Sequence, residues 1–186
     1  GKQIAEDLLQ SGAIVAALGR NIEKLESLKN NGFKNLFNFR CDVSKEEQVK
    51  KAFDEIYKRV STPYGLVNCA GINPSRNTIA KTSEQDWDQT IAVNLKGTFN
   101  CIKYAVDHMK KENEGSIVNI SSIAGKTGIG SSIAYAASKG ALNTMTLSLA
   151  KALGPEIRVN TVCPGFIGTG WFENRFGKET FERIKK

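Results

Sequence analysis

Tyr135 and Lys139 are the two residues whose types and spacing best suit proton transfer. Four residues apart on a helix, a phenol and an ammonium lie on the same face. A free tyrosine has a pKa of about 10, and a neighbouring ammonium lowers that pKa by favouring the phenolate. Tyr135 is therefore a candidate general acid or base near neutral pH. The same spacing is also common between exposed residues on helix surfaces that have no catalytic role. The neighbouring sequence must therefore show whether Tyr135 and Lys139 belong to an active site.

Three strand-like runs end in small or hydroxyl residues that could form the rest of a site. Ser121 and Ser122 follow one run, Cys69-Ala70-Gly71 follows a second, and Cys163-Pro164-Gly165 follows a third. The carboxyl ends of parallel strands are where open α/β sheets bind ligands. The serines could instead cap a turn. Three such exits beside one Tyr/Lys helix favour a shared active site.

The elements that must position these residues alternate along the whole chain. Short apolar runs predict five buried strands: Ile14–Leu18, Leu36–Phe39, Leu66–Asn68, Ser116–Ile120 and Arg158–Val162. Helical patterns lie between them: Lys45–Val60 with a capping box from Ser44, a long helix to about Lys111 opened by the capping box Thr82-Ser83-Glu84-Gln85, and Tyr135–Leu153 ended by Gly154-Pro155. This alternation predicts one α/β domain over residues 1–186, a Rossmann-like doubly wound parallel sheet.

Both ends of the sequence depart from that pattern. The first element is a helix, Lys2–Gln10, whereas a doubly wound domain places a strand and a phosphate-binding turn before its first helix. The other end stops in a charged helical stretch without a recognisable closing strand. The sequence therefore predicts a truncated or partly observed domain.

Composition and charge exclude several classes of protein. With 40% hydrophobic and 24% charged residues, the 186-residue chain is typical of a globular domain, and no apolar run reaches the roughly 18 residues of a membrane span. The net charge of +7 is concentrated in Lys103–Lys111 and Arg175–Lys186. No stacking aromatics accompany this charge, so we expect no nucleic-acid partner. A solvated basic face, an anionic cofactor or an acidic carrier would each fit.

Cysteine and histidine usage narrows the chemistry further. The four cysteines form no CxxC pair, and His108 is the only histidine. This excludes most zinc sites and any Ser-His or Cys-His pair not built on His108, so we expect no metal. Three of the cysteines lie in or beside strand-like runs, which predicts reduced thiols and a reducing compartment such as the cytoplasm.

Taken together, these motifs resemble the short-chain dehydrogenase/reductase family over nearly the entire chain, and most of all its 3-oxoacyl-carrier-protein reductases. Tyr135 and Lys139 match the family's YxxxK signature. Ser122 lies 13 residues before Tyr135, at the spacing of the catalytic serine, and Asn94 lies 28 residues before Ser122, matching the catalytic asparagine.

The resemblance implies the interconversion of a ketone and a secondary alcohol with a nicotinamide cofactor. Ser122 and Tyr135 would hydrogen-bond the carbonyl oxygen, and Tyr135 would deliver the proton. Lys139 would bind the nicotinamide ribose and tune Tyr135. Asn94 would hold a water that links Lys139 to solvent.

The resemblance also implies a set of cofactor-binding positions. Asp42 corresponds to the adenine contact, and Gly1 to the last glycine of the phosphate loop, most of which is absent from the sequence. Asn68-Cys69-Ala70-Gly71 looks like the family's NNAG motif, with Cys69 in place of the second asparagine. The implied cofactor-binding residues are Gly1, Arg20, Asp42, Val43, Asn68, Ala70, Gly71, Tyr135, Lys139, Pro164, Gly165, Ile167 and Thr169.

Arg20 bears on which nicotinamide is bound. The strand Ile14–Leu18 exits into Gly19-Arg20-Asn21 without the carboxylate that would accept bonds from a ribose 2′-hydroxyl. In the family, Arg20 aligns with the basic residue of NADP-preferring members, and a guanidinium pairs well with a phosphate. An arginine solvated near a helix start is the alternative. NADPH is favoured over NADH.

The substrate and the assembly are less determined. Residues 125–134 and those after Gly165 would set the substrate, and four aromatics there could line a pocket or pack a helix: Phe166, Trp171, Phe172 and Phe176. A 3-oxoacyl thioester, carried on an acidic acyl carrier protein, is the leading candidate. Another ketone, sugar or steroid-like alcohol is the alternative, and a catalytically silent NADP-binding scaffold is the alternative of another class. The family's usual contacts predict a homodimer or homotetramer through helices around Asp88–Met109 and Ala136–Leu153.

Overall fold

The computed structural model describes residues 1–26, 32–167, 177 and 179. Strands and helices alternate, as the sequence predicts. The strands are β1 (Val15–Gly19), β2 (Leu36–Arg40), β3 (Gly65–Asn68), β4 (Gly115–Ile120) and β5 (Ile157–Val162). The helices are α1 (Lys2–Gln10), α2 (Ile22–Glu26), α3 (Glu46–Arg59), α4 (Glu84–Ile91), α5 (Gly97–Glu112), α6 (Ala124–Thr127) and α7 (Ile133–Leu153), with a 3₁₀ turn η2 (Ile79–Lys81) and a π-helical segment η3 (Ala92–Lys96).

All strand pairing is parallel, so the carboxyl ends of paired strands share one edge. β1 pairs with β2, and β4 lies between β3 and β5. Within the described residues β1 does not pair with β3, in agreement with the expectation that the doubly wound sheet lacks its first strand. In the doubly wound order, the position between these two strands belongs to a strand that precedes the first helix, and this sequence begins at that helix.

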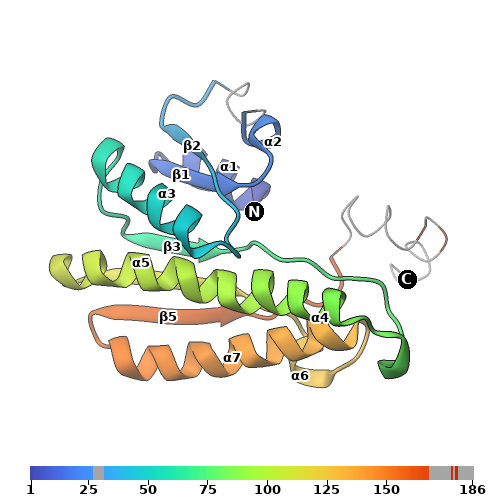
Figure 1. Ribbon diagram of the computed structural model, residues 1–186. Helices are drawn as coiled ribbons and strands as arrows, with labels where there is room; N and C mark the ends of the chain where they lie inside the picture. The colour runs from blue at the N-terminus through green and yellow to red at the C-terminus, as the bar shows by residue number, and fades with distance from the viewer. Residues whose placement is uncertain (27–31, 168–176, 178, 180–186) are drawn as a thin grey trace.

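One hydrophobic core unites the helices on one side of the strands (Figure 1). Val49 and Phe53 of α3, Ala105 of α5 and the strand residues Ile117 and Ile157 are all buried in it. A smaller cluster joins Leu9 of α1 to Leu36 of β2. This arrangement follows from strict alternation in β4, where every second side chain is buried.

The predicted long helix is present, with an unexpected turn in its middle. It begins at Ser83, whose Oγ accepts a hydrogen bond from the Asp86 N–H at 3.1 Å. It ends at Asn113 in the left-handed conformation. Between α4 and α5 the backbone widens into the π-helical segment η3, which carries Asn94. Such π-turns are frequent at functional sites.

The predicted capping box at Ser44 is wrong. The Ser44 hydroxyl donates to Asp42 Oδ1 at 2.7 Å, and α3 begins after Lys45 without a side-chain cap. Asp42, two residues upstream, is a charged acceptor for the Ser44 hydroxyl. The hydrogen bond to this carboxylate is stronger than the one that the Ser44 oxygen would accept from an unpaired backbone N–H at the start of the helix. The α7 helix does have a serine cap, Ser132, whose Oγ accepts from the Tyr135 N–H.

Within the described ranges, none of the helices combines the length and the apolar character that a membrane crossing requires. The same part of the chain holds no cluster of three His, Cys, Asp or Glu side chains arranged to bind one metal ion.

Candidate active site

Asn94 is the hub of a buried hydrogen-bond network. Its Oδ1 accepts from the Ile72 N–H at 2.8 Å, and its Nδ2 donates to the Ile72 carbonyl at 2.8 Å and to Ser138 Oγ at 3.0 Å. Ser138 in turn donates to the Tyr135 carbonyl at 2.7 Å. These bonds join the β3 exit, η3 and α7, which places Asn94 in the same site as the Tyr/Lys helix.

Lys139 is buried at the centre of this site. Only 4% of the residue is exposed, and its Nζ donates to the carbonyl of Ile120, the last residue of β4, at 2.6 Å. Burial lowers the pKa of the Lys139 ammonium to about 8. The Nζ atom lies 5.6 Å from the centroid of the Tyr135 ring. An ammonium has three donors, so the bond to Ile120 leaves capacity for further acceptors.

Ser121 and Ser122 fix the β4 exit against α6 and α7. Ser121 Oγ donates to the Lys139 carbonyl at 3.1 Å. Ser122 Oγ accepts from the Ala124 N–H at 3.2 Å, so the turn-capping interpretation of this serine is confirmed. That bond uses an oxygen lone pair and leaves the hydroxyl proton able to bind another acceptor. Capping and substrate binding are therefore compatible roles.

The β3 exit divides into an inward and an outward part. Asn68 is buried, and its Nδ2 donates to Asn119 Oδ1 at 2.9 Å. Its side chain is thus part of the sheet interior. Ala70 is exposed, and a Cβ built on Gly71 would lie 3.5 Å from Asn94 Oδ1 and 3.7 Å from Lys139 Nζ. The backbone at Gly71 therefore lies directly beside the buried polar centre.

The first helix begins at the same edge. A Cβ built on Gly1 would lie 3.5 Å from Cys69 Sγ, so the amino end of α1 adjoins the β3 exit. On the other flank of β4, the Pro164 carbonyl accepts from the Ile123 N–H at 2.9 Å, which joins the β5 exit to the β4 exit. Gly165 and Ile167 are exposed. Thr169 lies outside the described residues, as do Trp171, Phe172 and Phe176.

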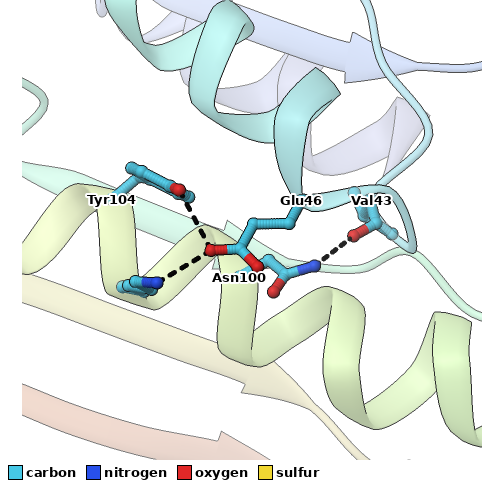
Figure 2. Close-up of polar contacts among 5 residues, drawn as sticks. Val43, Glu46, Asn100 and Tyr104 are labelled. Atoms are coloured by element: carbon cyan, nitrogen blue, oxygen red, sulfur yellow. Dashed lines mark hydrogen bonds and ion pairs between the residues drawn. The ribbon is translucent and has the colours of Figure 1, made fainter.

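The loop that carries Asp42 and Val43 is anchored to α5 (Figure 2). Asn100 Nδ2 donates to the Val43 carbonyl at 3.0 Å. A Cβ built on Gly97 would approach Val43 Cγ2 to 2.6 Å, so only glycine permits this close packing. The loop after β2 is thereby held at a fixed distance from α5, the helix that directly follows the segment carrying Asn94.

A second contact ties the start of α3 to the same helix. Figure 2 shows the Glu46 carboxylate, which accepts from Lys103 Nζ at 2.7 Å and from the Tyr104 hydroxyl at 3.1 Å. These two hydrogen bonds hold the pKa of Glu46 below its usual value, and the bond from Lys103 has the larger effect. Together with the Asn100 bond, this contact keeps the Asp42–Val43 loop in place.

Arg20 and Asp42 line one pocket of about 640 Å³ beside the ends of β1 and β2. Arg20 is exposed and follows the last residue of β1. Asp42 Oδ1 accepts from both the N–H and the hydroxyl of Ser44. The two residues that the sequence assigns to the adenosine end of a cofactor therefore face one cavity, apart from the Tyr135–Lys139 centre.

Sequence reasoning missed two features of the site. No role is predicted for Ser138 from the sequence, yet this residue is buried and links Asn94 to Tyr135. Cys69 and Cys163 both lie near the Lys139 ammonium. Their electrostatic interaction with it raises the pKa of Lys139 and so partly offsets the lowering that burial causes. The sequence does contain a sign that these two cysteines lie near the site, because each of them directly follows a strand that flanks β4.

Comparison with known proteins identifies the family. The model of the short chain dehydrogenase family matches residues 1–180, and the chain belongs to that family. An uncharacterized oxidoreductase of Thermotoga maritima is 45% identical over 171 residues, which are 89% of this chain and 66% of that protein. The chain thus spans just under two thirds of this relative's length.

Two further relatives carry informative names. The 3-oxoacyl-[acyl-carrier-protein] reductase of Bos taurus is 36% identical over 170 residues, covering 91% of this chain and 71% of that protein. A solved structure of ElxO with NADP bound superposes with a TM-score of 0.91 at 33% identity, over 99% of this chain and 78% of that one. The similarity in structure extends over all the elements described above.

The residues present fit a nicotinamide dinucleotide, by the chemistry of their donors. A desolvated ammonium with donors to spare is suited to ribose hydroxyls, and Gly71 leaves the space beside it without a side chain. Arg20, an exposed cation in the pocket of Asp42, is suited to a phosphate on the adenosine half. The two groups lie at the carboxyl ends of different strands, as an extended dinucleotide requires.

Proposed function

We propose that the protein is an NADP(H)-dependent oxidoreductase that interconverts a ketone and a secondary alcohol. The observation that carries this proposal is the buried Lys139 ammonium, which lies on the same helix face as Tyr135 and joins the strand exit that bears Ser122. A bound NADPH would supply the hydride. A binding module has no need of a phenol and a desolvated ammonium in this arrangement.

Each side chain then has a defined task. The Tyr135 hydroxyl hydrogen-bonds the substrate carbonyl oxygen and gives it a proton as negative charge develops there. The Ser122 hydroxyl donates a second bond to the same oxygen. Lys139 binds ribose hydroxyls and, as a cation, favours the phenolate that Tyr135 becomes. Asn94 holds the helix turn in place and supports a water path from Lys139 to solvent.

The cofactor preference follows from the adenosine end. Arg20 offers a guanidinium where an NAD-preferring site would offer a carboxylate. A guanidinium binds a 2′-phosphate through paired, charge-assisted hydrogen bonds. We therefore infer that NADPH is preferred over NADH.

The proposed substrate is a 3-oxoacyl thioester, and this step rests on the names of relatives and on charge. The Bos taurus relative is named for that activity. The net charge of +7 suits an acidic carrier protein as the bearer of the acyl chain. A different ketone, sugar or steroid-like alcohol would use the same catalytic residues, so a substrate panel must include each class.

Substitution of Tyr135 by Phe tests the catalytic assignment. We expect ketone reduction to fall by about 10²–10⁴-fold, because the proton donor is lost, while NADPH binds with unchanged affinity. Tyr64→Phe is the matched control, since Tyr64 is 57% exposed and lies before β3, at the opposite edge of the sheet. NADPH binding without turnover of any carbonyl by the unsubstituted protein would instead identify a scaffold.

A further inference from the structure

The pocket beside β1 and β2 contains more positive charge than the Arg20 assignment uses. Three cations line it: Arg20, Arg40 and Lys51. No carboxylate lies within ion-pair distance of these three in the part of the chain that the structure describes. The two acidic residues of the pocket are already engaged, Asp42 by Ser44 and Glu55 by Arg59 at 3.7 Å.

Strand register places Arg40 next to Arg20. Gly19, the last residue of β1, is paired with Arg40, the last residue of β2, and the Cys41 N–H donates to the Gly19 carbonyl at 2.9 Å. Neighbouring strands lie roughly 5 Å apart, so Arg40 lies about one strand spacing from the backbone that leads into Arg20. Arg40 is exposed at the end of its strand and lines the same cavity.

We propose that Arg40 is a second ligand of the cofactor's 2′-phosphate and helps determine the preference for NADPH. This inference rests on the proposed use of NADP(H). A phosphate dianion has three terminal oxygens, which two guanidinium groups on adjacent strands can share. Two like charges side by side without counter-ions repel each other, and a dianion between them removes that repulsion. NADH lacks the 2′-phosphate and gains nothing from Arg40.

Arg40 also has a purely structural alternative role. β2 pairs only with β1 among the described strands, and charged residues on an edge strand discourage pairing with other chains. Such a role requires no ligand and predicts no change in nucleotide affinity when the charge is removed. The two roles are therefore separable by binding measurements on the folded protein.

The experiment compares NADPH and NADH dissociation constants by fluorescence titration for the unsubstituted protein and for Arg40→Gln. We expect NADPH affinity to fall roughly tenfold, the effect of losing one charge-assisted pair, and NADH affinity to stay within twofold. Adenosine 2′,5′-bisphosphate, titrated by calorimetry, should lose affinity in parallel. ADP, which lacks the 2′-phosphate, should not.

Two control variants sharpen the test. Arg158→Gln removes one charge from a strand residue whose Cα pairs with Ser116, remote from the pocket, and should leave both affinities unchanged. Lys51→Gln removes a charge from the pocket wall without touching the strand ends, and should have a smaller effect than Arg40→Gln.

The outcomes separate this inference from the function on which it rests. Equal NADPH affinities for Arg40→Gln and the unsubstituted protein would overturn the role of Arg40 and leave the proposed function standing. So would an equal effect of Lys51→Gln, because the pocket would then act through its overall charge. Failure of the unsubstituted protein to bind either nucleotide would overturn the proposed function itself.

Discussion

At the scale of single residues, the chemistry of the site depends on one buried charge, the ammonium of Lys139. Lys139 lies in the interior, and its ammonium donates a hydrogen bond to the backbone carbonyl of Ile120. Desolvation disfavours the ammonium, which is why the pKa of Lys139 falls from 10.5 to about 8. The residue is thereby poised to lose or share a proton at a pH where surface lysines cannot.

This shift predicts how stability depends on pH. Below about pH 8 both the folded and the unfolded states hold the Lys139 proton, and the cost of burying the charge is fully present. Between about 8 and 10.5 the folded state releases the proton first, so the contribution of Lys139 to the free energy of unfolding rises with pH, by on the order of 3 kcal/mol in all. Urea unfolding of the cofactor-free protein and of Lys139→Met should show a stability difference that grows by this amount in favour of the unsubstituted protein between pH 8 and 10.5, because the titration of the buried cysteines is common to both and cancels. Parallel pH profiles for both proteins would contradict the assignment.

The four cysteines should divide into two classes of reactivity. Burial raises the pKa of Cys41 to about 11 and that of Cys101 to about 12, so both remain neutral thiols at pH 8. Only the thiolate reacts with alkylating reagents. Cys69 and Cys163 are partly exposed at strand ends. Mass spectrometry after brief iodoacetamide treatment should find label on Cys69 and Cys163 well before the other two, and early labelling of Cys101 would show the core to be open.

At the scale of elements, the site depends on backbones that approach more closely than side chains would allow. A Cβ built on Gly125 of α6 would lie 2.6 Å from the Lys139 carbonyl carbon and 2.8 Å from the Gly140 nitrogen. Because those atoms belong to the backbone of α7, they cannot move aside as a flexible side chain would. The contact holds the β4 exit, with Ser122, against the helix that carries Tyr135.

Gly125→Ala should therefore both destabilise and misplace the site. Overpacking of this kind costs about 1–3 kcal/mol, and a shift of α6 would carry Ser122 away from the substrate carbonyl. Thermal unfolding should show a lowered midpoint, and carbonyl reduction should fall more than cofactor binding. Gly65→Ala is the control, because its Cβ would meet only the Ser116 carbonyl oxygen, at 4.0 Å. Equal effects of the two substitutions would contradict the role of the α6–α7 contact.

Most elements could be predicted from sequence because periodicity and end signals coincide. The run 116–120 alternates and is buried on one face, and the predicted long helix begins within its expected start signal, although its cap is Ser83 rather than Thr82. Two features could not be predicted. The π-turn at Asn94 changes only the hydrogen-bond register, which leaves no mark on composition. The Ser44 cap of α3 is lost because the Ser44 hydroxyl donates to Asp42 instead.

The proposed catalytic residues could be singled out because Tyr135 and Lys139 share one helix face, while Ser122 and Asn94 lie at the sequence spacings of the family that the chain resembles. Arg40 shows the opposite case: its proximity to Arg20 exists only through the β1–β2 register. Ser138 is a third case. It is a small residue between Tyr135 and Lys139, and nothing in the sequence indicates that its hydroxyl accepts a hydrogen bond from Asn94 and donates one to the Tyr135 carbonyl. Contacts that depend on register or on burial require the structure.

At the scale of the whole molecule, two exposed apolar side chains favour assembly through the long helices. Phe99 of α5 is 49% exposed and Leu147 of α7 is 67% exposed, on helices that the sequence predicts as the contact surface. Single exposed apolar residues are common on protein surfaces, so the proposed interface also depends on the helices that form the family's usual contacts, on which both side chains lie. The assembly expected from them is a homodimer or homotetramer.

Size-exclusion chromatography with light scattering at micromolar concentration should thus detect a dimer or a tetramer. Leu147→Glu should shift the protein toward smaller species, because it places a charge in an apolar contact. Ile14→Ser is the matched control, since Ile14 is 61% exposed at the start of β1, away from both helices, and should leave the mass unchanged. A monomeric unsubstituted protein would rule out this assembly.

The buried ammonium of Lys139 also affects how long the folded protein survives proteolysis. A folded molecule with an empty site carries a charge that no ligand compensates, so it opens and is digested more readily than one whose site is filled. A ligand present at 100 times its dissociation constant adds about 2.7 kcal/mol to the stability of the fold. The abundance of the protein should therefore follow the supply of its nucleotide, because scarcity of the cofactor shortens the lifetime of the protein that uses it.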